Sequence, residues 1–491
     1  DHRFFGRRLS SSQVRSLNPG KAIGRLTEVP EVNLASSYQE RIVLLSKSYQ
    51  DLPRVAGIIA VEEENPLSHI QLLARSMGVP NISVSKEIAA KLSNRLGETI
   101  LLSANNAGQV SIQSAQQSVF SVSGSSNPDS LVSRTARPSS NNLECSDPSL
   151  MQVASLSQIA QSSSPEPCVG AKAAGLGKLK SHFPQYVSPA IVLPYAVFAE
   201  IMELPISPSQ SLRKWCGEEN QKIAQLSDVK LQDAAREALF HHMRDFIRNL
   251  SFKPEFVNKL RREMNRVLGA SYSLTNYGVY VRSSTNAEDN PDFSGAGLNK
   301  TIPNVVGFNQ LLRAILEVYA APFSKRAFSW RQSKFPDPCS LLIGVILQRT
   351  VAAERSGVML TTDLVDGKRK YLTIAANHGV GGVVNDKTAE IVRIDRTNGE
   401  VRIIAETGEY SRKVVDLNGG IRTIGASNQR RVLSNQQLAR LASFAKELDD
   451  ARFPIAAKQT EAETVADIEF GFVGNNLYLF QIRPLVGQDY L

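Results

Sequence analysis

Residues 65–80 read NPLSHIQLLARSMGVP, and this stretch predicts a short helix with a histidine at its start. Ser68 is a good N-cap, because its hydroxyl can accept a hydrogen bond from a free backbone N–H of the first turn. Four apolar residues recur at helical spacing and share one face: Ile70, Leu73, Ala74 and Met77. Gly78 and Pro80 predict where the helix ends.

The predicted helix places His69 in its first turn, beside unsatisfied backbone N–H groups and the positive end of the helix dipole. That position favours an anion, and a phosphate above all. A neutral imidazole nitrogen can attack phosphorus and carry the phosphoryl group it accepts. The alternative is a capped surface helix whose histidine has no chemical role. The other motifs of the chain decide between these interpretations.

The composition indicates a soluble globular protein. The 491 residues are 42% hydrophobic and 21% charged, which allows about two to four domains. The net charge of +9 fits anionic ligands such as nucleotides. No dense block of Lys and Arg with interleaved aromatic residues is present, so we expect no nucleic-acid partner. No apolar run reaches the roughly 18 residues of a membrane span, so we expect no membrane partner.

The cysteines and the first residues bear on the cellular compartment. The four cysteines are far apart and form no C-x-x-C pair: Cys145, Cys168, Cys216 and Cys339. They predict free thiols in a reducing compartment, which would be the plastid stroma in a plant or alga and the cytoplasm in a bacterium. The chain begins at Asp1, so we expect a processed or excised piece. Residues 1–16 are basic and Ser-rich, and are expected to be a transit-peptide-like segment or a solvated tail.

The order of apolar and polar segments predicts two folded parts joined by a linker. Residues 17–114 alternate strands with helices, as an α/β domain does; strands are expected at 21–26, 41–45, 54–61 and 99–103, and a second helix at 86–95. Residues 115–150 are Ser-rich and predict a flexible linker between moving domains, or an ordinary disordered spacer. Residues 151–491 predict a larger α+β domain of two lobes, helical over 196–267 and richer in strands afterwards.

Two polar motifs in the larger domain suit a nucleotide. The segment 169–177 (VGAKAAGLG) is a Gly-rich turn that contains Lys172 and leads into a helix, although it lacks the Walker A spacing. Arg282, in 281–289 (VRSSTNAED), stands at a predicted strand end as a bidentate phosphate ligand. The loop 293–297 (FSGAG) could close over phosphates. The alternatives are a simple turn and a surface salt bridge from Arg282 to an acidic residue of the same motif.

The last motif is a predicted hairpin of DIEF (467–470) and LYLFQIRP (477–484). Strand alternation puts Asp467 and Glu469 on one face, and Gln481 and Arg483 on one face of the partner strand. Carboxylate and amide oxygens are the hard ligands that Mg²⁺ prefers, and Arg483 would be free to hold a phosphate. The alternative is a polar sheet face without a metal.

Together these motifs resemble the ATP-binding domain shared by phosphoenolpyruvate synthase, pyruvate phosphate dikinase and the glucan, water dikinases. Residues 17–112 are similar to the swivelling phosphohistidine domain of the same families. The resemblance implies an ATP-grasp-like fold for 151–491. The implied ATP ligands are Lys172, Arg282 and Arg483, with backbone groups of Gln348–Val351 lining the adenine pocket. The implied Mg²⁺ ligands are Glu469 and Gln481, with Asp467 as a third.

The domain order refines the expected function. The histidine domain comes first and the ATP domain last, an order similar to the glucan and phosphoglucan, water dikinases. The resemblance implies that the ATP β-phosphoryl group passes to His69 and then to an α-glucan glucosyl hydroxyl, with AMP and phosphate as products. The alternatives are part of a phosphoenolpyruvate synthase-like enzyme, and a histidine phosphocarrier or regulatory protein that acts on a separate partner.

Overall fold

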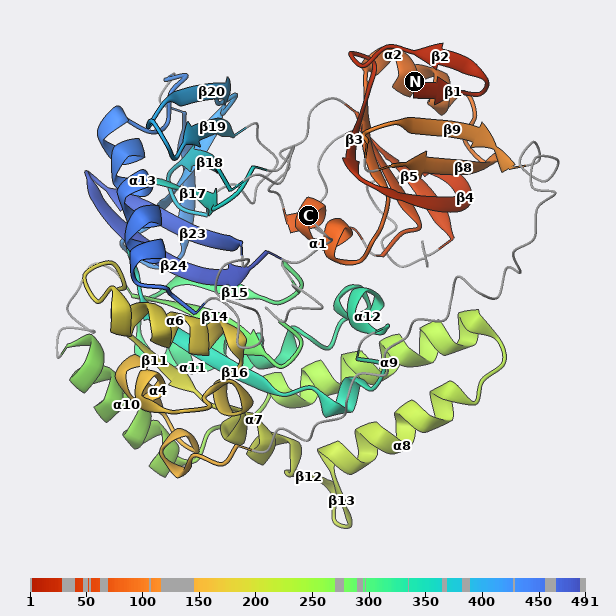
Figure 1. The fold of residues 1–491 in the computed structure, drawn as a ribbon. Helices are drawn as coiled ribbons and strands as arrows, with labels where there is room; N and C mark the ends of the chain where they lie inside the picture. The colour runs from red at the N-terminus through yellow and green to blue at the C-terminus, as the bar shows by residue number, and fades with distance from the viewer. Residues whose placement is uncertain are drawn as a thin grey trace. The chain divides into compact units, whose positions relative to one another are not determined.

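The computed structural model describes residues 2–28, 40–46, 52, 54–61, 69–105, 107–115, 145–269, 278–288, 295, 297–333, 335–363, 369–381, 389–426, 429–454 and 465–485. The chain forms two compact units, residues 1–143 (unit 1) and residues 144–491 (unit 2), drawn red to orange and yellow to blue in Figure 1. The boundary falls inside the predicted linker 115–150, most of which lies outside the described residues.

Unit 1 is built on a nine-stranded sheet in the order β2-β1-β9-β8-β4-β5-β6-β7-β3. Its strands are β1 (His2–Phe4), β2 (Arg7–Leu9), β3 (Val14–Asn18), β4 (Gly20–Glu28), β5 (Arg41–Leu45), β6 (Gly57–Val61), β7 (Asn81–Val84), β8 (Thr99–Ala104) and β9 (Val110–Ser114). The strands β4 to β7 run parallel, and helix α1 (His69–Ser76) connects β6 to β7. All four predicted strands lie in this sheet, and the α/β prediction for this unit is confirmed.

Two helices lie on opposite faces of the unit 1 sheet. Helix α2 (Lys86–Ser93) packs its apolar residues into the main core of the unit, with Leu26 and Ile42 among others. Helix α1 lies on the other face, where Gln71 accepts a hydrogen bond of 2.5 Å from the Asn81 side chain of β7. Asn81 pairs across the sheet with Ile58 of β6. Paired residues of neighbouring strands point to the same face of a sheet. The side chains of Asn81 and Ile58 therefore both lie on the face that α1 covers.

The first residues of the chain are part of this sheet, so the prediction of a solvated tail at residues 1–16 is wrong. Strands β1 and β2 form a hairpin in which Phe5 and Gly6 make the turn with φ of 45° and 82°. Positive φ at both turn residues matches the right-handed twist of the flanking strands. Phe4 is buried in the core of unit 1, which attaches the hairpin to the domain.

Unit 2 contains an antiparallel five-stranded sheet in the order β10-β11-β16-β14-β15. Its strands are β10 (Ala154–Ser155), β11 (Ala190–Leu193), β16 (Ile343–Arg349), β14 (Val279–Thr285) and β15 (Thr301–Val305). One apolar core joins this sheet to α7 (Tyr195–Met202), α8 (Leu212–Ala224), α9 (Val229–Arg248), α10 (Pro254–Leu268), α11 (Phe308–Ala320) and α12 (Lys325–Arg331). The predicted helical region 196–267 is confirmed.

A six-stranded sheet forms the second part of unit 2, in the order β20-β19-β18-β17-β23-β24. Its strands are β17 (Arg355–Leu360), β18 (Tyr371–His378), β19 (Glu390–Asp395), β20 (Val401–Ala405), β23 (Ala466–Val473) and β24 (Asn476–Pro484). The core of this part includes residues of α4 (Leu156–Gln161), α6 (Ala171–His182) and α13 (Asn435–Asp450). Two small hairpins, β12 (Pro205–Ser207) with β13 (Gln210–Ser211) and β21 (Ser411–Val415) with β22 (Ile421–Gly425), complete the unit.

Helix α6 packs closely against the hairpin strand β24. A Cβ atom built on Gly175 would lie 3.1 Å from the backbone oxygen of Ile482, and one on Gly177 would lie 2.7 Å from the Ile159 side chain. Glycine at these two positions therefore lets the helix approach β24 on one side and α4 on the other. The predicted Gly-rich turn is mostly helix: only Gly170, with φ of 86°, breaks the chain between α5 (Glu166–Val169) and α6.

The four cysteines form two disulfides, which overturns the prediction of free thiols. Cys145 bonds to Cys168, and Cys216 bonds to Cys339. The prediction of a reducing compartment thereby loses the observation on which it rested. The first disulfide also corrects the end of the predicted linker: Cys145 is covalently attached to α5, and Leu150, in the 3₁₀ helix Pro148–Leu150, is fully buried in the unit 2 core.

The Cys216–Cys339 disulfide joins α8 to the 3₁₀ helix η4 (Pro338–Ser340), which precedes β16.

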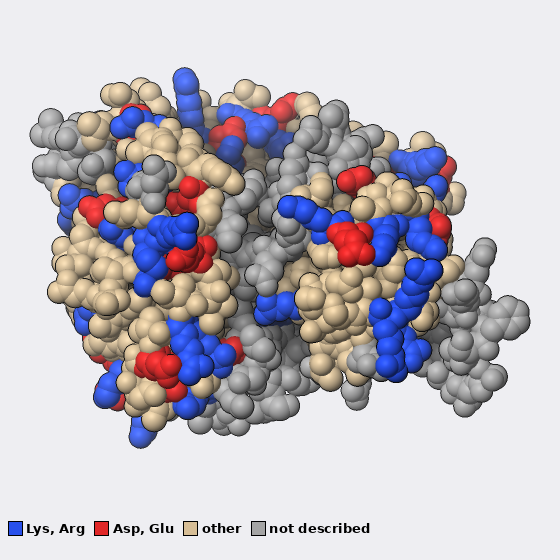
Figure 2. Space-filling model, turned by 90° about the horizontal axis from the view of Figure 1, so that it is seen from above, with Lys and Arg blue, Asp and Glu red and all other residues tan. Residues whose placement is uncertain are grey.

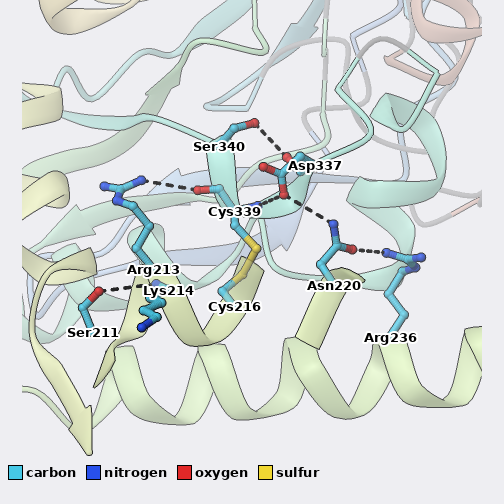
Figure 3. Close-up of a disulfide and its surroundings, with 9 residues drawn as sticks. All are labelled: Ser211, Arg213, Lys214, Cys216, Asn220, Arg236, Asp337, Cys339 and Ser340. Carbon is cyan, nitrogen blue, oxygen red and sulfur yellow. Dashed lines mark hydrogen bonds between the residues drawn. A yellow bond between two sulfur atoms is a disulfide. The ribbon is translucent and has the colours of Figure 1, made fainter. Parts of the chain in front are cut away.

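 Helix η4 leads directly into β16, the central strand of the five-stranded sheet (Figure 3). Beside the disulfide, Asp337 caps η4 through Cys339 N and also accepts a hydrogen bond from Asn220 of α8. The disulfide and these polar contacts therefore fasten one peripheral helix to the sheet.

Removing this disulfide is expected to lower the free energy of unfolding of unit 2 by about 3–5 kcal/mol, because the cross-link closes a long loop and so restricts the unfolded chain. The sequence separation of its cysteines is 123 residues. The measurement is denaturant unfolding of the Cys216→Ala/Cys339→Ala double variant against the unchanged chain. As a control, both proteins are unfolded in dithiothreitol, which reduces the disulfide of the unchanged chain and should bring the two free energies of unfolding closer together. Equal unfolding midpoints without reductant would contradict this expectation.

Among the described residues, no helix is both long enough and apolar enough to cross a membrane. Figure 2 shows Lys and Arg side chains interspersed with Asp and Glu on both units. Each unit therefore carries both signs of charge on the surface seen in this view.

Candidate functional site

In unit 1, the candidate functional residue His69 is the first residue of helix α1, which ends at Ser76. Leu73 and Ala74 are fully buried, as the predicted apolar face requires. Gly78 has φ of 63°, and the backbone N–H of Val79 closes the end of the helix on Ala74. The predicted helix and its stop are confirmed. The proposed N-cap Ser68 lies outside the described residues, and the chemical role of His69 stays a prediction.

In unit 2, the candidate site is centred on the hairpin of β23 and β24, whose register confirms the predicted pattern. Asp467 pairs with Arg483 and Glu469 pairs with Gln481. Because paired residues share a face and alternate residues return to it, all four side chains lie on one face of the hairpin. A register irregularity follows directly at Glu469–Phe470. The hairpin therefore presents two carboxylates, one amide and one guanidinium together.

Arg282 of β14 connects the two sheets of unit 2 at this face. One guanidinium nitrogen, Nη2, donates to Gln481 at 3.0 Å and to Glu469 at 3.3 Å. The other, Nη1, donates to Gln348 of β16 at 3.1 Å and to the backbone oxygen of Phe480 at 2.7 Å. The alternative interpretation, a surface salt bridge within the 281–289 motif, is therefore wrong. Arg282 is buried, and its ion-pair partner is Glu469 of the other sheet.

Arg483 and Asp467 form a buried ion pair beside Arg282. The Nε atom of Arg483 donates to Asp467 Oδ2 at 2.8 Å, and the two side chains are 6% and 2% exposed. Burial raises the pKa of the Asp467 carboxyl above its usual value; the nearby Arg483 opposes this shift and Glu469 adds to it. The second oxygen, Oδ1, is buried and has no hydrogen-bond partner among the described residues. An unused, desolvated carboxylate oxygen is a position that a cation would stabilise.

Lys172 lies in a second ion pair, with a residue that the sequence did not single out as its partner. Its ammonium contacts Glu288 Oε2 at 2.6 Å, and the Glu288 side chain is 2% exposed. Glu288 also accepts hydrogen bonds from Ser283 at 2.9 Å and from the Asn299 amide. The first turn of α6 is thereby held on β14, the strand that carries Arg282.

The local backbone explains how Lys172 reaches this position. Ser284 of β14 donates through its hydroxyl to the backbone oxygen of Val169 at 2.7 Å and accepts from Ala173 N at 3.1 Å. A Cβ atom on Gly170 would lie 2.6 Å from both Ser284 Oγ and Tyr195 Oη. Only glycine fits this close approach with its positive φ, so Gly170 sets the direction in which α6 and Lys172 leave the break.

Gln348 and Val351 have different places relative to this cluster. Gln348 lies in the central strand β16, and its side chain, as the partner of Arg282, belongs to the cluster. Its Nε2 atom is buried without a partner in the described part of the chain. Val351 follows β16 and is half-buried, and no described contact joins it to the cluster. An adenine pocket formed by backbone groups of this segment stays a prediction.

The charges of the cluster bear on which ligands it would accept. Its cations are Lys172, Arg282 and Arg483, and its anions are Glu288, Asp467 and Glu469, so the formal charges cancel. A polyphosphate bound here would therefore need further positive charge, which Mg²⁺ would supply.

The oxygens present fit a magnesium ion. Glu469 and Gln481 already converge on one cationic nitrogen, Arg282 Nη2, and Asp467 Oδ1 has no hydrogen-bond partner within the described ranges. No group of three or more His, Cys, Asp or Glu in those ranges is arranged to hold a metal. A metal here would therefore depend on two carboxylates, the Gln481 amide and oxygens of the nucleotide.

Several members of the cluster were not identified as site residues from the sequence. Glu288 is one of the two acidic residues of the 281–289 motif, for which the sequence suggested only a surface salt bridge with Arg282. It suggested no role for Ser283, Ser284 or Asn299. The polar run that ends β14 was a signal for the serines. The loop 293–297, predicted to close over phosphates, lies largely outside the described residues.

The family comparison matches most of unit 2. Residues 166–489, about two thirds of the chain, match the family described as pyruvate phosphate dikinase, AMP/ATP-binding domain. The solved structure of D-alanine-D-alanine ligase from Helicobacter pylori is 10% identical and covers 55% of this chain and 60% of its own, with a TM-score of 0.18. That score supports no conclusion.

Curated relatives are similar over about half of the chain. Rifampicin phosphotransferase from Streptomyces sviceus is 32% identical over 45% of this chain and 24% of its own length. A probable phosphoenolpyruvate synthase from Archaeoglobus fulgidus is 30% identical over 42% and 27%, and the phosphoenolpyruvate synthase of Aquifex aeolicus is 29% identical over 53% and 31%. The chain thus spans about a quarter to a third of the length of these three relatives.

These relatives support the wider group of phosphoenolpyruvate synthase and pyruvate phosphate dikinase, and give no specific support to a glucan, water dikinase. The matched segment contains every residue of the Arg282 cluster, from Lys172 to Arg483. By this match over two thirds of its length, the chain belongs to the pyruvate phosphate dikinase AMP/ATP-binding domain family.

Proposed function

We propose that the chain is an ATP-dependent dikinase-type phosphotransferase that works through a phosphohistidine at His69. The observation that carries this proposal is the cluster around Arg282, in which two sheets bring cations, carboxylates and an amide together within a matched ATP-binding domain. Phosphoryl transfer is catalysed mainly by positioning and charge stabilisation, and such a cluster supplies both.

In the proposed first half-reaction, a nitrogen of His69 attacks the β-phosphorus of ATP. The bond from that phosphorus to the oxygen shared with the α-phosphate breaks, AMP leaves, and water releases the γ-phosphate as inorganic phosphate. Lys172, Arg282 and Arg483 would neutralise the phosphate oxygens. Glu469 and Gln481, with Asp467, would hold Mg²⁺, which screens the charge of the polyphosphate when bound.

In the proposed second half-reaction, a hydroxyl of an acceptor attacks the phosphohistidine and takes the phosphoryl group. The preferred acceptor is an α-glucan glucosyl hydroxyl, supported by the order of a histidine domain followed by an ATP domain. A small-molecule acceptor is the second candidate, because relatives of the matched region are named rifampicin phosphotransferase and phosphoenolpyruvate synthase. A phosphocarrier that transfers to a separate protein is the third.

The test is labelling of the chain with ATP carrying ³²P at the β-phosphate. We expect an acid-labile, base-stable label that His69→Ala abolishes, because an imidazole N–P bond is cleaved by acid. The matched control is His241→Ala, since His241 is an exposed surface histidine of α9. A label that survives in His69→Ala would refute the nucleophile assignment.

The nucleotide product and the acceptor are tested in the same reaction. AMP should accumulate with the label, whereas ADP as the sole product would indicate an ordinary kinase. Chase experiments with soluble α-glucan, pyruvate or rifampicin distinguish the acceptors. Discharge by a small molecule and not by glucan would overturn the glucan proposal while leaving the first half-reaction intact.

A further inference from the structure

The carboxylate of Glu288 has two oxygens with different kinds of partner. Oε2 contacts the Lys172 ammonium at 2.6 Å. Oε1 accepts hydrogen bonds from the Ser283 hydroxyl at 2.9 Å and from the Asn299 side-chain amide. Within the described ranges, these three groups are the only side-chain partners of a carboxylate that is 2% exposed. Two neutral donors therefore hold one oxygen and leave the other for the lysine.

The chain on both sides of Glu288 fixes this carboxylate. Ser283 lies in β14, whose last residue is Thr285, and the backbone N–H of Glu288 donates to the Thr285 oxygen at 3.3 Å. On the other side, a Cβ atom on Gly295 would lie 3.2 Å from both Cα and Cγ of Glu288. Gly295 has φ of 59°, so glycine suits this close packing. The Glu288 side chain is thus held between β14, Gly295 and Asn299.

Lys172 is fixed at its charged end by Glu288 and at its backbone by β14. It belongs to the first turn of α6, which lies beside β14 (Figure 1) and donates from the backbone N–H of Ala173 to Ser284 Oγ at 3.1 Å. The side chain between these points is a flexible four-carbon stem, and the ammonium has three N–H donors. Among the described residues, Glu288 is the one polar partner of the ammonium. One donor is thereby fixed, and two remain for other acceptors.

We propose that Glu288 is a positioning residue that directs the Lys172 ammonium toward the phosphates of ATP and stays paired with it when the nucleotide binds. The inference rests on the proposed role of Lys172 as a phosphate ligand. Glu288 would not touch the nucleotide itself. It would hold one N–H of the ammonium, so that the other two are already oriented when charge develops on the transferred phosphoryl group.

The alternative is an inhibitory contact, in which ATP draws Lys172 away from Glu288. Burial argues against this exchange, because Glu288 is 2% exposed and its other side-chain partners, Ser283 and Asn299, are uncharged. A buried carboxylate that loses its cation is strongly destabilised, since neither water nor a second charge compensates it. The Lys172 side chain is 16% exposed, so a ligand can reach its ammonium while the pair is intact.

The test is a double-mutant cycle on the full chain that combines Glu288→Asp with Lys172→Met. Aspartate keeps the negative charge but withdraws the carboxylate by about 1.5 Å, so it separates position from charge. The measurements are the rate of labelling with ATP carrying ³²P at the β-phosphate, and the affinity for ATP in EDTA. With Lys172 present, Glu288→Asp should lower the rate at least about tenfold and the affinity at least about threefold. In the Lys172→Met background it should change neither quantity by more than about twofold.

Three further variants complete the design. Glu288→Gln separates positioning from competition: loss of a competitor would speed labelling, whereas we expect labelling to slow at least about tenfold. Ser283→Ala keeps every charge and removes one donor to Oε1, so it replaces Glu288→Asp if that variant does not fold; it should slow labelling about threefold, again only with Lys172 present. Glu166→Gln is the matched control, because Glu166 pairs with another lysine of α6, Lys178, and is 41% exposed. It should label at the rate of the unchanged chain.

The outcomes distinguish positioning from a structural role and from a failure of the proposed function. Labelling by Glu288→Asp or Glu288→Gln at or above the unchanged rate would overturn the proposal. Equal losses with and without Lys172 would also overturn it, and would assign Glu288 to the stability of the domain, which thermal unfolding of each variant measures. If the unchanged chain is not labelled, the dikinase function fails, and the ATP affinities of the same cycle test Glu288 independently. A loss of affinity confined to the proteins that contain Lys172 would then support the positioning role.

Discussion

Replacing Arg282 with methionine is expected to abolish ATP-dependent labelling of the chain and to destabilise unit 2 by roughly 3 kcal/mol. The guanidinium contacts Gln348, Glu469 and Gln481 from one buried position. Methionine fills a similar volume but leaves a carboxylate without its cation. This loss lies at the lower end of the range for a broken buried ion pair, because the Glu469 side chain is 26% exposed and water can solvate it.

The Arg282 prediction has a conservative arm and a control. Arg282→Lys keeps the positive charge, but its single ammonium cannot reach the four acceptors that the two guanidinium nitrogens contact. This variant should therefore also lose most of the labelling. Arg266→Met is the control, since Arg266 is an exposed arginine of α10 paired within its own helix. Thermal unfolding and labelling are measured for all three variants. Labelling by Arg282→Met at the rate of the unchanged chain would remove this residue from the proposed catalytic machinery.

The parts of the site that the sequence predicted correctly depend on short-range patterns. Alternation along two adjacent strands was enough to place Asp467 with Glu469 and Gln481 with Arg483, and a tight loop between them fixed the pairing. The helix at His69 was predicted because its apolar spacing and its terminal Gly78 both lie within a few residues. Patterns of this length are determined by backbone geometry alone.

The N-terminal hairpin shows how composition can mislead. Basic and serine residues dominate 1–16, which suggested a solvated segment, yet β1 and β2 are only three residues each and need little apolar content. The turn signal was Gly6, whose φ of 82° supports a two-residue hairpin loop. Burial of Phe4 then attaches the hairpin to the core.

The remaining errors concern contacts between residues that are far apart in the sequence. Lys172 and Glu288 are 116 residues apart, and Arg282 and Glu469 are 187 apart. The cysteines of the longer disulfide are 123 residues apart. No local propensity reports such a pairing, because it is decided by which sheets and helices pack together. Spacing between cysteines also cannot show which of them meet.

The last prediction concerns Glu469→Gln, which is expected to separate metal binding from nucleotide binding. The substitution keeps the shape of the side chain and its oxygen but removes one negative charge. The charges of the cluster, three positive and three negative, then sum to +1. Two measurements should therefore move in opposite directions: the affinity for ATP without metal, and Mg²⁺-dependent labelling of His69.

We expect ATP to bind the Glu469→Gln variant several-fold more tightly in EDTA, because one carboxylate no longer repels the phosphates. Labelling should fall at least about a hundredfold at the Mg²⁺ concentration that saturates the unchanged chain. Higher Mg²⁺ should restore part of it, since the amide oxygen is a weaker ligand. A purely structural role for Glu469 would lower both quantities together, because a loosened hairpin binds neither nucleotide nor metal. Opposite shifts therefore identify Glu469 as a metal ligand, and parallel losses return the hairpin to a structural role.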